Sequence, residues 1–233
     1  MDLSCVGLFG FVSGGLVHVS GDGLHVLDRD GQTVAQYRMT EHLVCADVLS
    51  SDPTVFALGT QSGTVMLMRL NPEIDPDFVF ELSVAFGPVV DVRLVNEMEM
   101  YILCEGCRLV KVGINEEMQT LEITSELRCP DVPLRFIKGE GLLIKLQSGE
   151  VFRLGNGSEW VHLDQYNSAL MATKSFLVKP NGIFRMPKFE VVQTITNFAG
   201  ATVCDDLAAY WTKTRLVYLF NNAELVGRKQ MDK

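Results

Sequence analysis

The clearest pattern of hydrophobic and polar positions lies between residues 44 and 70, VCADVLSSDPTVFALGTQSGTVMLMRL. Alternation at 44–48 predicts a first strand, and the polar turn at 50–53 separates it from a second strand at 55–59. Ser62-Gly63 then allows a tight hairpin into a third strand at 64–70, because glycine adopts positive φ without a Cβ clash. Three short antiparallel strands form a meander that needs neighbouring sheets to bury both of its faces.

Similar hairpins recur along the chain. Their turn residues are Gly23, Gly63, Gly106, Gly149, Gly182 and Thr214, spaced by 40, 43, 43, 33 and 32 residues. A further strand-like segment follows each hairpin, at 33–37, 78–82, 120–123, 159–163, 190–195 and 224–226. Others precede the hairpins, at 5–11, 44–48, 89–94, 132–137, 170–173 and 201–204. Six units of four strands, repeated at about forty residues, are typical of a β-propeller.

Residues 44–70 resemble a WD40 repeat in the succession VxxxV, SxDP and ALGTQSGTVMLM. A second likeness runs from Pro88 to Leu94 and continues from Met100 to Leu109. The Gly-His and Trp-Asp dipeptides of that family are absent. The resemblance implies an all-β chain with a single closed propeller over 1–227, of about six four-stranded blades or alternatively seven. Residues 228–233 are then expected to form a short basic tail.

Composition and charge narrow the class of protein. The chain has 233 residues, 47% of them hydrophobic, and no apolar run reaches the length of a membrane span. The first residues lack the basic region of a signal peptide, so we expect a cytoplasmic or nuclear protein that is not secreted. The net charge of −9 disfavours direct nucleic-acid binding and favours docking on a basic partner surface.

Cys104-Glu-Gly-Cys107 has the spacing of a zinc-ligand pair. A complete site would need two more ligands, for which Cys129 and a histidine would have to converge. The alternative is a hairpin turn at Glu105-Gly106 with the two cysteines facing each other across its mouth. Because a second ligand pair is missing, we expect no metal and no cofactor, and Cys104 and Cys107 stay the candidate pair.

Catalytic motifs find little support in the sequence. His42 lies beside Glu41, and His162 lies near Asp164, but neither histidine has a nucleophile at a suggestive spacing. The predicted inner strands are mostly apolar. Their polar exceptions at comparable places are Asp47, Asp91 and Arg135.

Three hypotheses for function follow. The first is a non-catalytic scaffold or adaptor, a subunit of a larger intracellular assembly that docks on a basic partner protein. The second is a component or regulator of a ribonucleoprotein or ribosome that inserts its C-terminal tail or loops, with Arg228, Lys229 and Lys233 as candidate contacts. The third is a propeller enzyme with a site at the axial channel, built on Asp47, Asp91 and Arg135.

Overall fold

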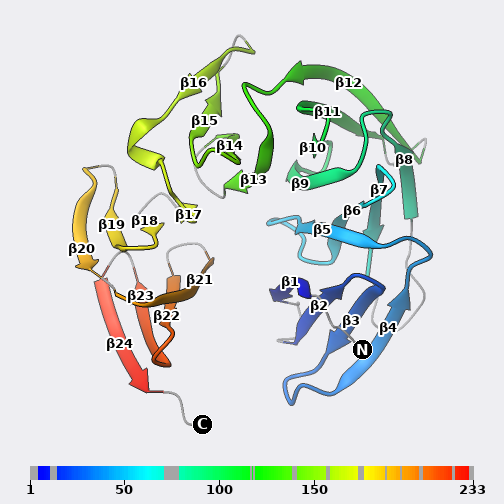
Figure 1. Ribbon diagram of the computed structural model, residues 1–233. Coiled ribbons are helices and arrows are strands. Elements are labelled where there is room, and N and C mark those ends of the chain that lie inside the picture. Colours follow the sequence, from blue (N-terminus) through cyan, green and yellow to red (C-terminus); the bar gives the residue numbers. More distant parts are fainter. Residues whose placement is uncertain are drawn as a thin grey trace. The chain divides into compact units, whose positions relative to one another are not determined.

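The computed structural model contains β-strands numbered β1 to β24 and a single 3-10 helix (Figure 1) among the residues it describes. It describes residues 5–10, 15–70, 79–115, 117, 119–137, 141–155, 158–172, 176–186, 188–194, 196–204, 207–221 and 224–230. Within them, no helix is long and apolar enough to cross a membrane. The chain divides into two compact units, 1–135 and 136–233, and each is described by itself.

The first unit holds three four-stranded antiparallel sheets, here called blades 1 to 3. Blade 1 consists of β1 (Cys5–Gly10), β2 (Leu16–Ser20), β3 (Gly23–Leu27) and β4 (Thr33–Arg38). Blade 2 consists of β5 (Leu43–Val48), β6 (Val55–Thr60), β7 (Thr64–Arg69) and β8 (Val79–Ser83). Blade 3 consists of β9 (Val89–Asn96), β10 (Glu99–Cys104), β11 (Arg108–Asn115) and β12 (Thr120–Arg128).

Three further sheets, blades 4 to 6, complete the chain, and the division between the units falls within the first strand of blade 4. Blade 4 consists of β13 (Pro133–Ile137), β14 (Leu143–Leu146), β15 (Val151–Leu154) and β16 (Trp160–His162), and the 3-10 helix η1 (Asp164–Tyr166) follows it. Blade 5 consists of β17 (Met171–Ala172), β18 (Phe176–Lys179), β19 (Gly182–Arg185) and β20 (Glu190–Thr194). Blade 6 consists of β21 (Phe198–Cys204), β22 (Leu207–Thr212), β23 (Leu216–Asn221) and β24 (Glu224–Gln230).

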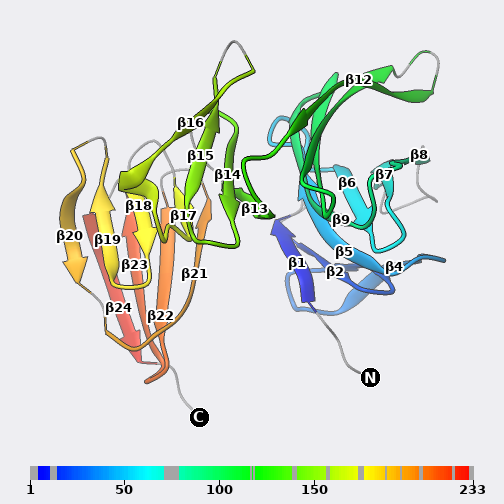
Figure 2. The same ribbon diagram turned by 45° about the horizontal axis from the view of Figure 1, so that its top comes forward.

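The prediction of six four-stranded units is confirmed, and in every sheet the strands lie side by side in chain order (Figure 2). Two outer strands are longer than predicted, because β12 runs to Arg128 and β24 to Gln230. Arg228 and Lys229 therefore belong to the last strand, and the tail expected from residue 228 is at most 231–233, which lie outside the described residues. A single propeller domain over 1–227 stays a prediction.

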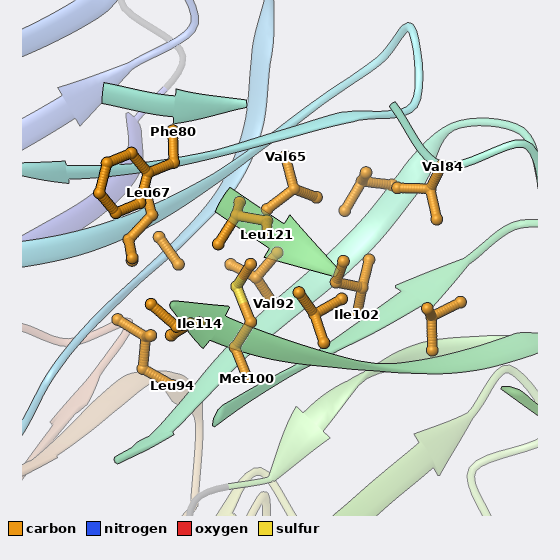
Figure 3. Close-up of a cluster of buried hydrophobic side chains, with 14 of the residues drawn as sticks. Val65, Leu67, Phe80, Val84, Val92, Leu94, Met100, Ile102, Ile114 and Leu121 are labelled. Carbon is orange, nitrogen blue, oxygen red and sulfur yellow. The ribbon is translucent and has the colours of Figure 1, made fainter. Parts of the chain in front are cut away.

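The core of the first unit lies between consecutive sheets. In β6, every residue is buried, because alternate side chains leave the sheet on opposite faces. Phe56 and Leu58 pack toward blade 1, whereas Val55 and Ala57 pack toward blade 3. The larger of these clusters joins Val65, Leu67 and Phe80 of blade 2 to residues of blade 3, among them Val92, Leu94, Met100, Ile102, Ile114 and Leu121 (Figure 3).

The second unit repeats this arrangement around blade 5. Phe176, Val178 and Ile183 pack with Tyr210 and Phe220 of blade 6. Leu177, whose side chain leaves β18 on the opposite face, packs instead with residues of blade 4 and of the segment that follows it, among them Leu143, Val151 and Ala169. Because such strands are buried on both faces, their sequences are continuous apolar runs rather than alternating apolar and polar residues.

A buried hydroxyl closes the central hairpin of several blades. Thr60 Oγ1 accepts the Thr64 N–H at 2.9 Å and donates to the Thr64 carbonyl at 3.0 Å. Thr212 makes the corresponding contact with the Leu216 N–H at 3.2 Å, and Ser20 donates to the Gly23 carbonyl at 3.1 Å. Each of these residues ends the second strand of its blade, so they satisfy turn groups that would otherwise be buried without a partner.

In four blades, the third residue after the end of the second strand takes the left-handed conformation. It is Gly63 (φ 91°), Cys107 (φ 55°), Gly149 (φ 91°) and Arg215 (φ 64°). The turn residues predicted in blades 3 and 6, Gly106 and Thr214, are thus one position too early. Only glycine adopts this conformation freely, so Cys107 and Arg215 hold backbone strain of about 1–2 kcal/mol each.

Substitution of Gly63 should reveal both the conformation and the crowding of this turn. A Cβ at Gly63 would meet the Gly87 carbonyl oxygen at 2.8 Å, whereas Gly87 itself has φ 84° and open space around its Cβ position. We expect Gly87→Ala to lower the free energy of unfolding by about 1 kcal/mol through φ alone, and Gly63→Ala to lower it by clearly more. Urea unfolding of both variants measures the difference. Equal losses would contradict the crowding.

Candidate functional site

Cys104 and Cys107 do not face each other across a hairpin. Cys104 is the last residue of β10, is fully buried and pairs with Arg108, whereas Cys107 is a half-buried turn residue. Cys104 occupies the position that Thr60 and Thr212 hold in their blades. The structure therefore corrects the geometry of the expected turn and assigns Cys104 to the core.

Cys129 approaches this pair because of the architecture of the blade. Its N–H donates to the Cys107 carbonyl at 2.8 Å. The same bond joins Val84 to the Gly63 carbonyl at 2.8 Å and Ser168 to the Gly149 carbonyl at 3.2 Å. In each case the left-handed turn residue accepts a bond from the segment that follows the outer strand, so the proximity of the cysteines needs no metal to explain it.

Burial disfavours the thiolate form of these cysteines. It raises the pKa of Cys104 to about 11, with a smaller contribution from the Glu126 carboxylate. Burial likewise raises the pKa of Cys129 to about 12. Within the described ranges no three His, Cys, Asp or Glu side chains gather in a way that could hold a metal ion.

Two of the three polar residues predicted on inner strands, Asp47 and Asp91, are hydrogen-bonded within the fold, and the third, Arg135, is half-buried on β13. Asp47 is buried, and its Oδ2 accepts the Leu94 N–H of blade 3 at 3.0 Å. The Arg93 Nε lies 4.0 Å from the same oxygen. Asp91 Oδ1 accepts the N–H of the next residue, Val92, at 3.0 Å. Asp47 thus links two blades, which is a structural role.

Within the part of the chain that the structure describes, neither His42 nor His162 is hydrogen-bonded to a hydroxyl group. His162 stacks on Phe152 at 4.9 Å, and its Nδ1 lies 3.2 Å from an oxygen of Asp164. Its Nε2 lies 3.7 Å from Glu150 Oε1. The neighbouring Ser148 Oγ donates to Glu150 at 2.9 Å, so it is bonded to a carboxylate rather than to the imidazole. His42 packs its ring against Gly21.

A surface hollow of about 730 Å³ lies at one end of blade 3. Its walls are mostly apolar and are formed by Ser51, Asn96, Glu97, Met98, Glu99, Lys111, Gly113 and Thr124. The hairpin of β9 and β10 turns at Glu97-Met98. The outer hairpin, formed by β11 and β12, extends further, through Ile114 and Asn115, which pair only with β12. The Ile114 N–H donates to the Met98 carbonyl at 2.8 Å and holds this overhang in place.

The charge left without an ion-pair partner at the hollow is negative, because its one lysine is paired with a glutamate. Lys111 Nζ lies 2.6 Å from Glu99 Oε2, and this bond raises the pKa of the lysine. Glu97 is exposed, and within the described residues no basic side chain pairs with it or with Glu122, which lies opposite Gly113. The acidity of Glu97 and Glu99 was visible in the sequence; the hollow was not, since it depends on the unequal lengths of two hairpins.

The other charged candidates lie elsewhere. Arg228 lies on β24 with its guanidinium carbon 5.4 Å from the centre of the Tyr218 ring, and Lys229 is exposed opposite Val217. Lys233 lies outside the described residues. So do several of the acidic positions noted along the chain, namely Glu73, Asp75, Asp77, Glu116, Asp205 and Asp206.

Comparison with solved structures identifies the fold. The WD40 repeats of RRP9 match with a TM-score of 0.65 and 10% identity, covering 97% of this chain and 79% of that chain. A structure of U3-55K matches with a TM-score of 0.64 and 10% identity, covering 98% of this chain and 82% of that one. The chain has a WD40-like propeller fold.

A third propeller-fold match is BBS1N, solved in complex with ARL6DN. It has a TM-score of 0.54 and 11% identity, and covers 100% of this chain and 69% of that chain. No family model matches the sequence, and no curated protein matches it. The degenerate WD40 resemblance is therefore confirmed at the level of fold, which survives where sequence identity does not.

Thiol reactivity tests the assignment of the cysteines. In a Cys5→Ser/Cys204→Ser background, Cys107 should react first with a disulfide reagent at pH 8. Cys104 should react far more slowly, because a pKa near 11 leaves about a hundredfold less thiolate than an ordinary thiol. Mass spectrometry after timed quenching reads the order. The control is unfolded protein in guanidinium, in which all the thiols should react rapidly. Equal rates for Cys104 and Cys107 in the folded protein would contradict this assignment.

Proposed function

We propose that this chain is a non-catalytic interaction scaffold, a subunit of a larger intracellular assembly that docks on a basic protein surface. The observation that carries the proposal is the contrast between two sets of charges. The inner-strand carboxylates Asp47 and Asp91 are hydrogen-bonded within the fold, whereas Glu97 and Glu122 lie at the surface with no basic partner among the described residues.

The overall charge supports the same proposal. A net charge of −9 attracts a basic surface over a distance of about one Debye length and speeds the encounter. Matches of propeller fold cover nearly the whole chain, and one of them, BBS1N, was solved bound to another protein. Fold alone does not determine function, so the proposal rests on this likeness together with the charge.

A second candidate function is binding to a ribonucleoprotein or ribosome through the C-terminal strand. Arg228 and Lys229 are both exposed on β24, the outer strand of blade 6, where basic side chains can reach an RNA phosphate. In this case nuclease treatment should release the partner. For the scaffold proposed first, the complex should persist after nuclease treatment and dissociate with salt.

Affinity purification of the tagged full chain tests both candidates. At about 0.1 M salt we expect reproducible co-purification of at least one basic protein, lost as salt screens the charges. Quantitative mass spectrometry against an unrelated acidic protein of similar net charge provides the control. Reconstitution with the purified partner must reproduce the complex. A chain that returns only as a free monomer would contradict the scaffold function.

A further inference from the structure

We propose that the hollow at the end of blade 3 is the docking site for an extended lysine- or arginine-bearing segment of the partner. This inference rests on the proposed function and specifies its surface. The hollow combines mostly apolar walls with carboxylates at its rim. All the residues that line it lie in the first unit.

The shape of the hollow suits a long side chain. Gly113 provides a floor without a side chain, and a Cβ there would lie 3.2 Å from the Thr124 Cγ2. Met98, which is 73% exposed, forms an apolar wall on the turn between β9 and β10. Lysine and arginine carry apolar stems beneath a charged head, so they can cover such walls while the head stays at a polar rim.

The charge of the rim selects the sign of the occupant. Glu99 and Lys111 neutralise each other, which leaves Glu97 on the wall of the hollow to attract a cation. Glu122 adds a second carboxylate beside the hollow, because it pairs with the floor residue Gly113 on the neighbouring strand. An exposed Glu117 lies on the turn of the outer hairpin nearby. An anionic occupant such as nucleic acid would face uncompensated carboxylates, and a purely apolar one would leave them without a partner.

The neighbouring strand favours an extended occupant. β12 is the last strand of its sheet, pairs with β11 alone and is the longest strand among those described, with nine residues (Figures 1 and 2). Its residues 122–126 are all exposed. A partner strand can add its main-chain hydrogen bonds along this edge, while alternate side chains reach Glu122 and the hollow.

Peptide binding measures this directly. The probe is a fluorescently labelled twelve-residue peptide that alternates lysine with threonine. Its affinity for the 233-residue chain is measured by fluorescence anisotropy. Matched peptides carry acetyl-lysine, which keeps the stem but removes the charge, or glutamate. We expect the lysine peptide to bind at least tenfold more tightly than either. A single-stranded oligonucleotide that bound here in place of the lysine peptide would overturn the proposal.

Two variants of equal charge locate the site. Glu97→Gln/Glu122→Gln should weaken binding of the lysine peptide at least tenfold. The control pair Asp30→Asn/Glu105→Gln removes the same charge from exposed positions outside the hollow and should change binding less than twofold. Equal weakening by both pairs would overturn the proposal, because it would mean non-specific attraction. A Glu97→Lys/Glu122→Lys variant should instead bind the glutamate peptide.

The same variants separate failure of this site from failure of the scaffold function. If the Gln pair and the wild type capture the same basic partner equally, the partner docks elsewhere and the hollow is not its site, although the scaffold function stands. If no partner is captured while the lysine peptide binds as expected, the hollow binds basic segments and the scaffold function is wrong.

Discussion

Burial of both faces of each middle sheet is the constraint on which the rest of this structure depends. A four-stranded sheet whose two faces are apolar cannot be stable by itself, and β6 shows the extreme case, with all six residues buried. Phe56 and Ala57 are adjacent in sequence but pack into different clusters. Because neighbouring sheets complete each other's cores, loss of one sheet would expose the face of the next.

This constraint explains why so degenerate a sequence keeps its fold. Each sheet must offer apolar residues on both faces and a turn that reverses the chain, but no particular dipeptide is required. The family's Gly-His and Trp-Asp pairs are absent, while a buried hydroxyl at Ser20, Thr60 and Thr212 closes the central hairpin of three blades. In blade 3 a buried thiol, Cys104, holds the same place.

The repeat could be predicted from the sequence because strand period and turn composition are local properties. The six units and the hairpins at Gly63 and Gly149 were predictable in this way. The left-handed residues Cys107 and Arg215 were not, since glycine is the usual marker of that conformation and neither residue is glycine. The end of β24 was also missed, because exposed strands such as its segment through Arg228 and Lys229 carry no hydrophobic alternation.

The candidate site was harder to predict from the sequence than the fold. Cys104 and Cys107 formed the most suggestive motif, yet the backbone bond from Cys129 to Cys107 is a repeated feature of the blades and accounts for their proximity. Conversely, Glu97 and Glu122 are unremarkable in sequence and lie 25 positions apart. The segments that carry them are brought together by β11, whose Gly113 pairs with Glu99 of β10 on one side and with Glu122 of β12 on the other. Asp47 is buried and its hydrogen bond to Leu94 links two blades, whereas Glu97 and Glu122 lie at the surface, where they can bind another molecule. Telling these two kinds of carboxylate apart requires the strand register.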